Sequence, residues 1–217
     1  ALILSGGVSP AAAAHIAFAA GILPLISGAM LHFVPVLMRG RPPGRMLQLL
    51  PLAMLAAGLL AAAAFLLPPF FEAGIRLAVL AGLTSAAILA GWIRRRSRVA
   101  LGAPHPGLHW YLAAVLCLAL ALAAVLAMEF FPAQRAALRL FHLHLNTLGF
   151  IGLTALGTLA VLLPTAAGRP DPDAAGWLRR MLPWTLAGVL LTAVGASWWQ
   201  PASHAGLLLL FVFAYFW

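Results

Sequence analysis

Histidine is the side chain best suited to chemistry in this sequence. Four of the seven histidines fall just inside the same predicted end of long apolar segments: His15, His142, His144 and His204. Neutral imidazole is the usual protein ligand of b-type haem and a good ligand for copper or zinc, and two imidazoles on facing helices suffice for a six-coordinate haem iron. The placement therefore predicts a haem b site, with copper as the alternative.

His15 and His144 form the candidate axial pair, because they occupy equivalent depths in two segments of similar pattern. His142 is the alternative ligand in its segment. Residues two apart project about 200° from each other on a helix, so one metal cannot take both His142 and His144. For copper, the candidate ligands are His15, His144 and His204.

Arginines lie close to these histidines. Arg135 and Arg139 are one or two helical turns above His142 and are candidates to bind haem propionates at the outer surface. A competing interpretation needs no cofactor. Histidines at helix ends also bond to lipid headgroups or loop carbonyls, and arginines there extend to the interface.

The other residues near these histidines and arginines each allow two interpretations. Asn146 is a candidate hydrogen-bond partner of His142, or a bridge between helices. The small residues of the same segment either permit close helix packing or make room for a flat macrocycle: Gly149, Gly152, Thr154, Gly157 and Thr158. At the opposite membrane side, a second site of His32 with His109 is a weaker candidate, since His105 and His109 also fit loop and helix-start positions.

The elements that carry these histidines are membrane spans. The chain is 64% hydrophobic and 8% charged, whereas soluble domains are roughly 25% charged. A bilayer core takes about 20 apolar residues per helix, and long runs rich in Leu and Ala lack the alternation of membrane strands. The pattern predicts an all-α, polytopic transmembrane bundle of about seven helices near 11–38, 46–68, 73–93, 108–131, 137–164, 177–199 and 203–217.

The charge distribution predicts orientation. The net charge of +9 comes from arginine, because the chain has no lysine. Most arginines fall in alternate loops, which the positive-inside rule assigns to the cytoplasm, so the expected location is a bacterial inner membrane with the N-terminus outside. This distribution argues against nucleic-acid binding. Five tryptophans are expected in interfacial belts: Trp198 and Trp199 outside, and Trp92, Trp110 and Trp177 inside.

Few other chemical groups are present. The four acids are Glu72, Glu129, Asp171 and Asp173, all near predicted surfaces, which argues against a buried carboxylate relay. Glu72 is expected to pair with Arg76. Cys117 is the one cysteine, which excludes an internal disulfide, covalent haem attachment through two cysteines and a thiolate zinc site. The chain begins without Met and ends at Trp217 within an apolar run, so either end is expected to be incomplete.

An internal repeat relates the two halves. His15, Gly28 and Pro35 have the spacing of His144, Gly157 and Pro164, at an offset of 129 residues. At an offset of 132, further matches join Gly44, Pro51, Pro69, Ala73 and Gly74 to Gly176, Pro183, Pro201, Ala205 and Gly206. The alternative is coincidence in a chain rich in Ala and Leu.

The repeat predicts a four-helix unit in which helices one to three recur as helices five to seven. The expected divisions are 1–107 for the first repeat, 108–136 for helix four with its outer loop, and 137–217 for a second repeat that is incomplete at its C-terminal end.

The fifth segment, from His142-Leu-His144 through Asn146, Gly149, Gly152 and Gly157 to Pro164, resembles the haem-ligand helix of subunit I in haem-copper oxidases and nitric oxide reductases. The segment from His15 to Pro35 is similar. The resemblance covers two helices, and it implies that His144 or His142 is an axial haem ligand with His15 as its partner. No helix carries the histidine cluster that holds copper in that family, and no tyrosine lies near one, so the resemblance implies a relative without the binuclear site.

These observations predict a bacterial inner-membrane protein that binds haem b and serves electron transfer, haem-based sensing or a respiratory complex. Expected partners are the lipid bilayer, other membrane subunits or a periplasmic redox protein. The alternatives are a cofactor-free scaffold, accessory subunit or transporter-like protein and, less favoured, a copper-handling protein. The residues do not decide whether the protein is an enzyme.

Overall fold

The chain is helical throughout its described part. The computed structural model describes residues 9–99 and 103–215, and no strand occurs in those ranges. Six stretches in them are long and apolar enough to cross a bilayer: Pro10–Leu37, Arg45–Leu66, Pro68–Arg98, Gly107–Phe130, Pro132–Ala166 and Ala174–Trp198. The prediction of an all-α, multi-pass membrane protein is confirmed.

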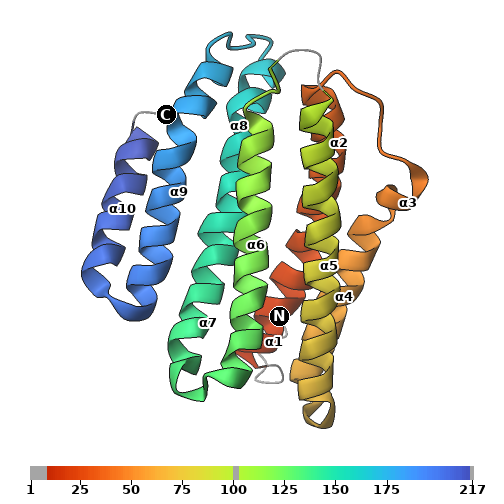
Figure 1. Ribbon diagram of the computed structural model, residues 1–217, viewed down its shortest axis with the longest axis vertical. Coiled ribbons are helices and arrows are strands. Elements are labelled where there is room, and N and C mark those ends of the chain that lie inside the picture. The colour runs from red at the N-terminus through yellow and green to blue at the C-terminus, as the bar shows by residue number, and fades with distance from the viewer. Residues whose placement is uncertain (1–8, 100–102, 216–217) are drawn as a thin grey trace. The chain divides into compact units, whose positions relative to one another are not determined.

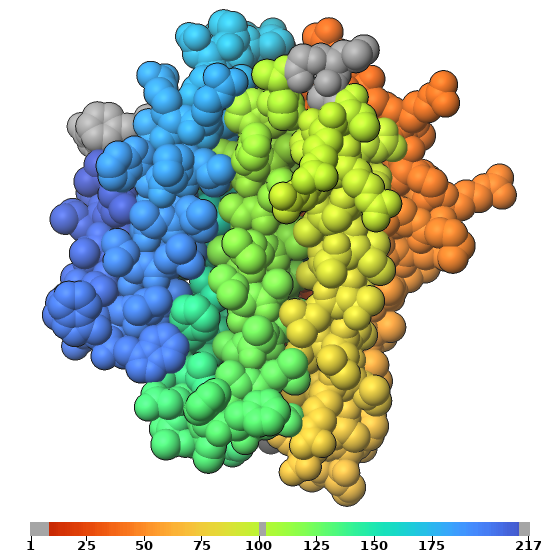
Figure 2. Space-filling view, viewed as in Figure 1, coloured from red at the N-terminus to blue at the C-terminus, as the bar shows by residue number. Residues whose placement is uncertain are grey.

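The seventh predicted span, 203–217, forms helix α10 (Gln200–Tyr215), and residues 216–217 lie outside the described ranges. Its apolar stretch Gln200–Val212 is shorter than the other six. α10 turns back along α9 (Ala174–Trp198), and the two helices lie side by side (Figures 1 and 2). Leu208 and Phe211 on α10 are exposed, which suits a helix that faces lipid.

The chain divides into two compact units, and the division falls after Leu89, inside helix α5 (Phe71–Arg98). The first unit begins with one long helical stretch in three parts: α1 (Pro10–Ala14), the π-helix η1 (His15–Ile22) and α2 (Leu23–Leu37). It continues through α3 (Arg45–Gln48), α4 (Leu50–Leu66) and the 3-10 turn η2 (Pro68–Phe70) into α5 (Figure 1).

The second unit repeats this type of broken helix. After α6 (Gly107–Phe130) and the turn η3 (Pro132–Gln134), a long stretch consists of α7 (Arg135–His144), the π-helix η4 (Leu145–Gly152) and α8 (Leu153–Ala166). α9 and α10 follow. The boundary between the compact units does not test the predicted sequence divisions at 107 and 136, so the four-helix repeat stays a prediction.

Glycines let the helices of each unit approach closely. In the first unit, a Cβ at Gly58 of α4 would overlap the backbone carbonyl of Ala19 in η1. In the second, a Cβ at Gly149 would lie 2.6 Å from Cys117 Cβ, and one at Gly157 would lie 2.7 Å from Trp110 Cβ. Helices in lipid associate through such van der Waals contacts, because lipid tails provide no hydrophobic drive.

Trp110 is the main correction to the predicted aromatic belts. Its side chain is fully buried rather than facing lipid. Its Nε1–H donates to the backbone carbonyl of Leu178 at 2.9 Å, and its ring stacks on Trp177 with centroids 6.3 Å apart. The indole therefore joins α6 to α9. Trp198 and Trp199, expected in the outer belt, are exposed.

Local backbone structure matches at the ends of α2 and α8. Each helix contains a proline in its last turns and ends in a Schellman-type cap, with a left-handed residue at Arg39 (φ 48°) or Gly168 (φ 69°). The closing bonds correspond at an offset of 129: Gly40 N to Pro35 O and Arg39 N to Val36 O, against Arg169 N to Pro164 O and Gly168 N to Thr165 O. The two helices thus end in the same way.

The Glu72–Arg76 pair is confirmed, with 3.9 Å between Arg76 Nη2 and Glu72 Oε2. Both side chains are more than half exposed, so the pair adds little to stability.

Gly28 and Gly157 have matching positions in the sequence, and replacing each by alanine is expected to affect the stability of the protein differently. Gly157→Ala should lower stability by about 1–3 kcal/mol, because the new methyl group meets the fixed Cβ of a buried tryptophan. Gly28→Ala should be neutral or stabilising, since a Cβ there comes no closer than 3.7 Å to Pro51 and alanine favours helix. Thermal unfolding of the purified variants in detergent measures both; equal losses would contradict the packing described.

Candidate functional site

His15 stands at the junction of α1 and the π-helix η1. Its Nδ1 lies 2.8 Å from the backbone carbonyl of Ala11, one turn earlier. A carbonyl only accepts, so Nδ1 carries the proton and the lone pair is on Nε2. The ring packs against Phe65 of α4, with centroids 4.5 Å apart, and Phe65 meets Phe71 edge-on. His15 is half-buried and held in one orientation.

His144 has the same local arrangement at the junction of α7 and the π-helix η4. Its Nδ1 donates to the carbonyl of Leu140 at 2.8 Å, so its lone pair is also on Nε2. The histidines and their acceptors are both 129 residues apart. His15 is the first residue of one eight-residue π-helix, and His144 directly precedes the other. π-helical segments are rare and occur frequently at functional sites. The sequence pairing of His15 with His144 therefore has a counterpart in local geometry.

The ring of His142 is used differently. Its Nδ1–H donates to the carbonyl of Ala121 in α6 at 2.9 Å. Asn146 donates to the backbone carbonyl of His142 at 2.9 Å, and the Nδ2 of Asn146 is 3.4 Å from the Nε2 of His142. Asn146 is thus a partner of His142, as the spacing predicts, and His142 links α7 to α6.

The two arginines share a face with His142 rather than with His144. At about 100° per residue, Arg139 is roughly 60° from His142 and 140° from His144, and Arg135 is roughly opposite His144. Both arginine side chains are exposed. The predicted propionate contacts therefore suit a haem on His142 better than a haem on His144.

The remaining predicted residues are not assembled into a ligand group. His204 is exposed and is the fifth residue of α10. Within residues 9–99 and 103–215, no three His, Cys, Asp or Glu side chains are grouped as metal ligands would be. His32 lines a pocket of the first unit and His109 a pocket of the second. His15 and His144 also belong to different units, so both predicted pairs stay predictions.

One histidine outside the spans has a defined local role. His105 precedes α6, and its Nδ1 accepts the backbone N–H of Gly107 at 3.1 Å. Partial burial lowers the pKa of His105 from its usual value, because burial disfavours the charged ring. The neutral ring thus caps the first turn of α6.

Comparison with known proteins gives one partial match. Over 58 residues the chain is 38% identical to cytochrome c oxidase subunit 1 of Thermus thermophilus. The match covers 26% of this chain and 54% of that protein's length. No family model matches the sequence, and no solved structure matches the chain. The chain is therefore a multi-pass membrane protein with a limited similarity to an oxidase subunit.

Stability measurements should separate the roles of the two neighbouring histidines. We expect His142→Ala to cost about 1 kcal/mol, because it removes the hydrogen bond that joins α7 to α6. His144→Ala should cost less in protein without cofactor, since its bond is to its own helix. Thermal unfolding in detergent tests this; a greater loss for His144→Ala would refute the assignment.

The stability of the protein is expected to fall at acid pH because of His105. The folded state lowers the pKa of His105, so the unfolded chain takes up a proton first as pH falls below about 6.5. The stabilisation present above that pH is then lost. The thermal midpoint should fall less between pH 7.5 and 5.5 in His105→Asn, whose amide oxygen keeps an acceptor near Gly107; an unchanged pH profile would remove this role.

Proposed function

We propose that this protein is a membrane-embedded haem b protein in which His15 and His144 are the axial ligands through Nε2. The observation that carries the proposal is the matched bond from each Nδ1–H to the carbonyl four residues earlier. Two imidazoles that both keep their lone pair on Nε2 are the donor set of a six-coordinate haem.

The local geometry suits ligation. An Nδ1–H that donates to a backbone carbonyl fixes the tautomer and the ring orientation, and it makes Nε2 a stronger base. The packing of Phe65 on His15 adds a further restraint on rotation. Each ring is thus prepared in advance, which reduces the entropy lost on binding.

His142 is the poorer candidate ligand. Its Nδ1–H bonds to another helix, and the amide of Asn146 lies against its ring. The lone pair of His142 also lies on Nε2, but iron there would compete with the Asn146 amide, whose Nδ2 is 3.4 Å away. We therefore assign His142 to the support of α7, and we give Arg135 and Arg139 no direct part in binding a haem on His144.

Haem b in such a site supplies reversible one-electron transfer. The chain's own part is to hold each imidazole in one rotamer through its Nδ1–H bond and to leave its lone pair on Nε2. The partial similarity to an oxidase subunit supports a place in a respiratory assembly with other membrane subunits or a periplasmic redox protein. The arginine distribution supports a bacterial inner membrane with the N-terminus outside.

A cofactor-free scaffold is the second candidate function. It is favoured by the structural uses of histidine in this fold, in particular the bond from His142 to Ala121 and the stacking of His15 on Phe65. In that case the histidines serve packing alone, and the protein binds only lipid and neighbouring subunits.

A visible spectrum separates these functions. Protein expressed with a haem supply should show Soret and α bands that sharpen on reduction with dithionite. His15→Ala and His144→Ala should each lose the low-spin bands and retain less than about a tenth of the bound haem, because one bond of the axial pair is gone.

His142→Ala is the matched control and should keep the low-spin spectrum. A colourless wild-type protein would exclude haem and favour the scaffold, and metal analysis of that preparation would then test copper binding by His15, His144 and His204. Full retention of the bands in both alanine variants would overturn the ligand assignment.

A further inference from the structure

A pocket of about 280 Å³ opens between the first turns of α6 and α9 in the second unit. Both helices begin at the same end of this unit (Figure 1), and each begins a stretch long and apolar enough to cross a bilayer. The pocket therefore lies at the end of two spans, where lipid headgroups meet the apolar core. Its lining residues all belong to the second unit: Pro104, Pro106, His109, Leu178, Arg179 and Leu182.

The polar side chains of this pocket come from His109 of α6 and Arg179 of α9, and both residues are exposed. A guanidinium group stays charged in proteins and binds phosphate oxygens with paired N–H groups, and imidazole offers an N–H in either charge state. Among the described residues, no acid lines the pocket. Glu129 is at the other end of α6, and Asp171 and Asp173 precede α9. The pocket thus presents a cation without an acidic neighbour in its wall.

The rest of the pocket wall is apolar and fixed in place. Leu182 is one helical turn from both Leu178 and Arg179, so the leucines and the arginine share one face of α9. The Nε1–H of Trp110, the residue after His109, donates to the carbonyl of Leu178 at 2.9 Å, which joins α6 to α9 beside the pocket. A site whose two sides are already held together loses less entropy when a ligand binds.

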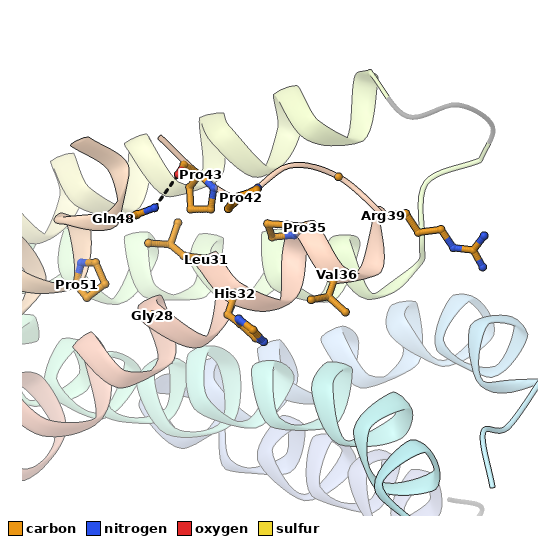
Figure 3. A pocket seen from close by; sticks show the side chains of 11 residues that line it. Gly28, Leu31, His32, Pro35, Val36, Arg39, Pro42, Pro43, Gln48 and Pro51 are labelled. Carbon is orange, nitrogen blue, oxygen red and sulfur yellow. Dashed lines mark hydrogen bonds between the residues drawn. The ribbon is translucent and has the colours of Figure 1, made fainter. Parts of the chain in front are cut away.

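The pocket beside Gly28 in the first unit is larger, at about 590 Å³, and differs in charge. Figure 3 shows the rings of Pro42, Pro43 and Pro51 in its wall, and the side chain of Arg39 points away from them. The cation and the apolar wall are thus separated in this pocket, whereas they share a helix face in the pocket between α6 and α9.

We propose that the pocket between α6 and α9 binds the headgroup of an anionic phospholipid. Its phosphate would lie on Arg179 and His109, and the start of its acyl chains would lie against Leu178 and Leu182. A phospholipid joins a phosphate to apolar chains, whereas free phosphate would leave the leucines without a partner. Basic pockets between transmembrane helices suit anionic headgroups.

The size of the pocket agrees with this occupant. Its volume is just below the range of about 300–1,000 Å³ that is typical of sites enclosing a whole small ligand. It therefore suits a headgroup whose chains stay in the bilayer. Lipid binding here is independent of haem binding.

Lipid titration of the purified full chain tests the proposal, with native mass spectrometry counting the bound lipids. Phosphatidylglycerol is the anionic probe, and phosphatidylcholine with the same acyl chains is the zwitterionic control. We expect phosphatidylglycerol to bind at least about fivefold more tightly, and Arg179→Gln to lower its affinity about fivefold, the effect of one arginine near an anionic lipid surface.

Arg180→Gln is the matched control, because it removes the same charge from a neighbouring exposed residue that does not line the pocket. It should change the affinity less than about twofold, since an exposed charge outside the site is screened. If Arg179→Gln fails to fold, His109→Phe serves, and it should lower the affinity about threefold by removing one hydrogen bond to the phosphate.

Three results would overturn the proposal. Equal losses in Arg179→Gln and Arg180→Gln would assign the binding to diffuse surface charge. Equal affinity for the two lipids would remove the selectivity for an anion. Displacement of phosphatidylglycerol by inorganic phosphate would assign the pocket to a free anion instead of a lipid.

Discussion

Every backbone polar group inside a bilayer must find its partner within the protein, and the rest of this structure depends on that constraint. It explains why the described spans are helices, and it also governs the polar side chains on them. Thr154, Thr158 and Thr192 each donate to the carbonyl four residues earlier, and no buried side-chain nitrogen or oxygen in the described residues lacks a partner. His15 and His144 obey the same rule through Nδ1. The bond to their own helix fixes the tautomer of each ring and leaves its lone pair on Nε2.

The long helices are interrupted where the histidines lie. An eight-residue π-helix adjoins His15 in one unit and His144 in the other, and in each case a regular helix resumes and continues to a proline near its end. A π-helix has one more residue per hydrogen-bonded turn, so it shifts the faces of the residues that follow. Gly157, which contacts Trp110 of α6, comes after this shift. The π-helix therefore couples the direction in which the histidine side chain projects to the face with which the same helix packs against its neighbours.

The sequence predicted the helical class, the approximate ends of six spans and the bond between Asn146 and His142, because apolar run length and one-turn spacing are local properties. It predicted the equivalence of His15 and His144 from spacing alone. It did not predict the π-helices, since no local signal separates them from an α-helix in Ala- and Leu-rich sequence. It also placed Trp110 at the lipid interface, because an aromatic near a helix end has that preference when nothing is known of its neighbours. The contact with Gly157 that buries Trp110 joins segments distant in the sequence.

The two units differ mainly in their side chains rather than in the backbone at the ends of their long helices. Both long helices end in the same cap, yet the left-handed position is Arg39 in one and Gly168 in the other. A side chain in that conformation costs about 1–2 kcal/mol, whereas glycine adopts it freely. The second unit thus has an unstrained cap, and its Gly157 is in close contact with Trp110, whereas the first has a strained cap and an open pocket beside Gly28. Packing contacts stabilise a protein in lipid as they do in water. The first unit would therefore become more stable if side chains filled the pocket at this end.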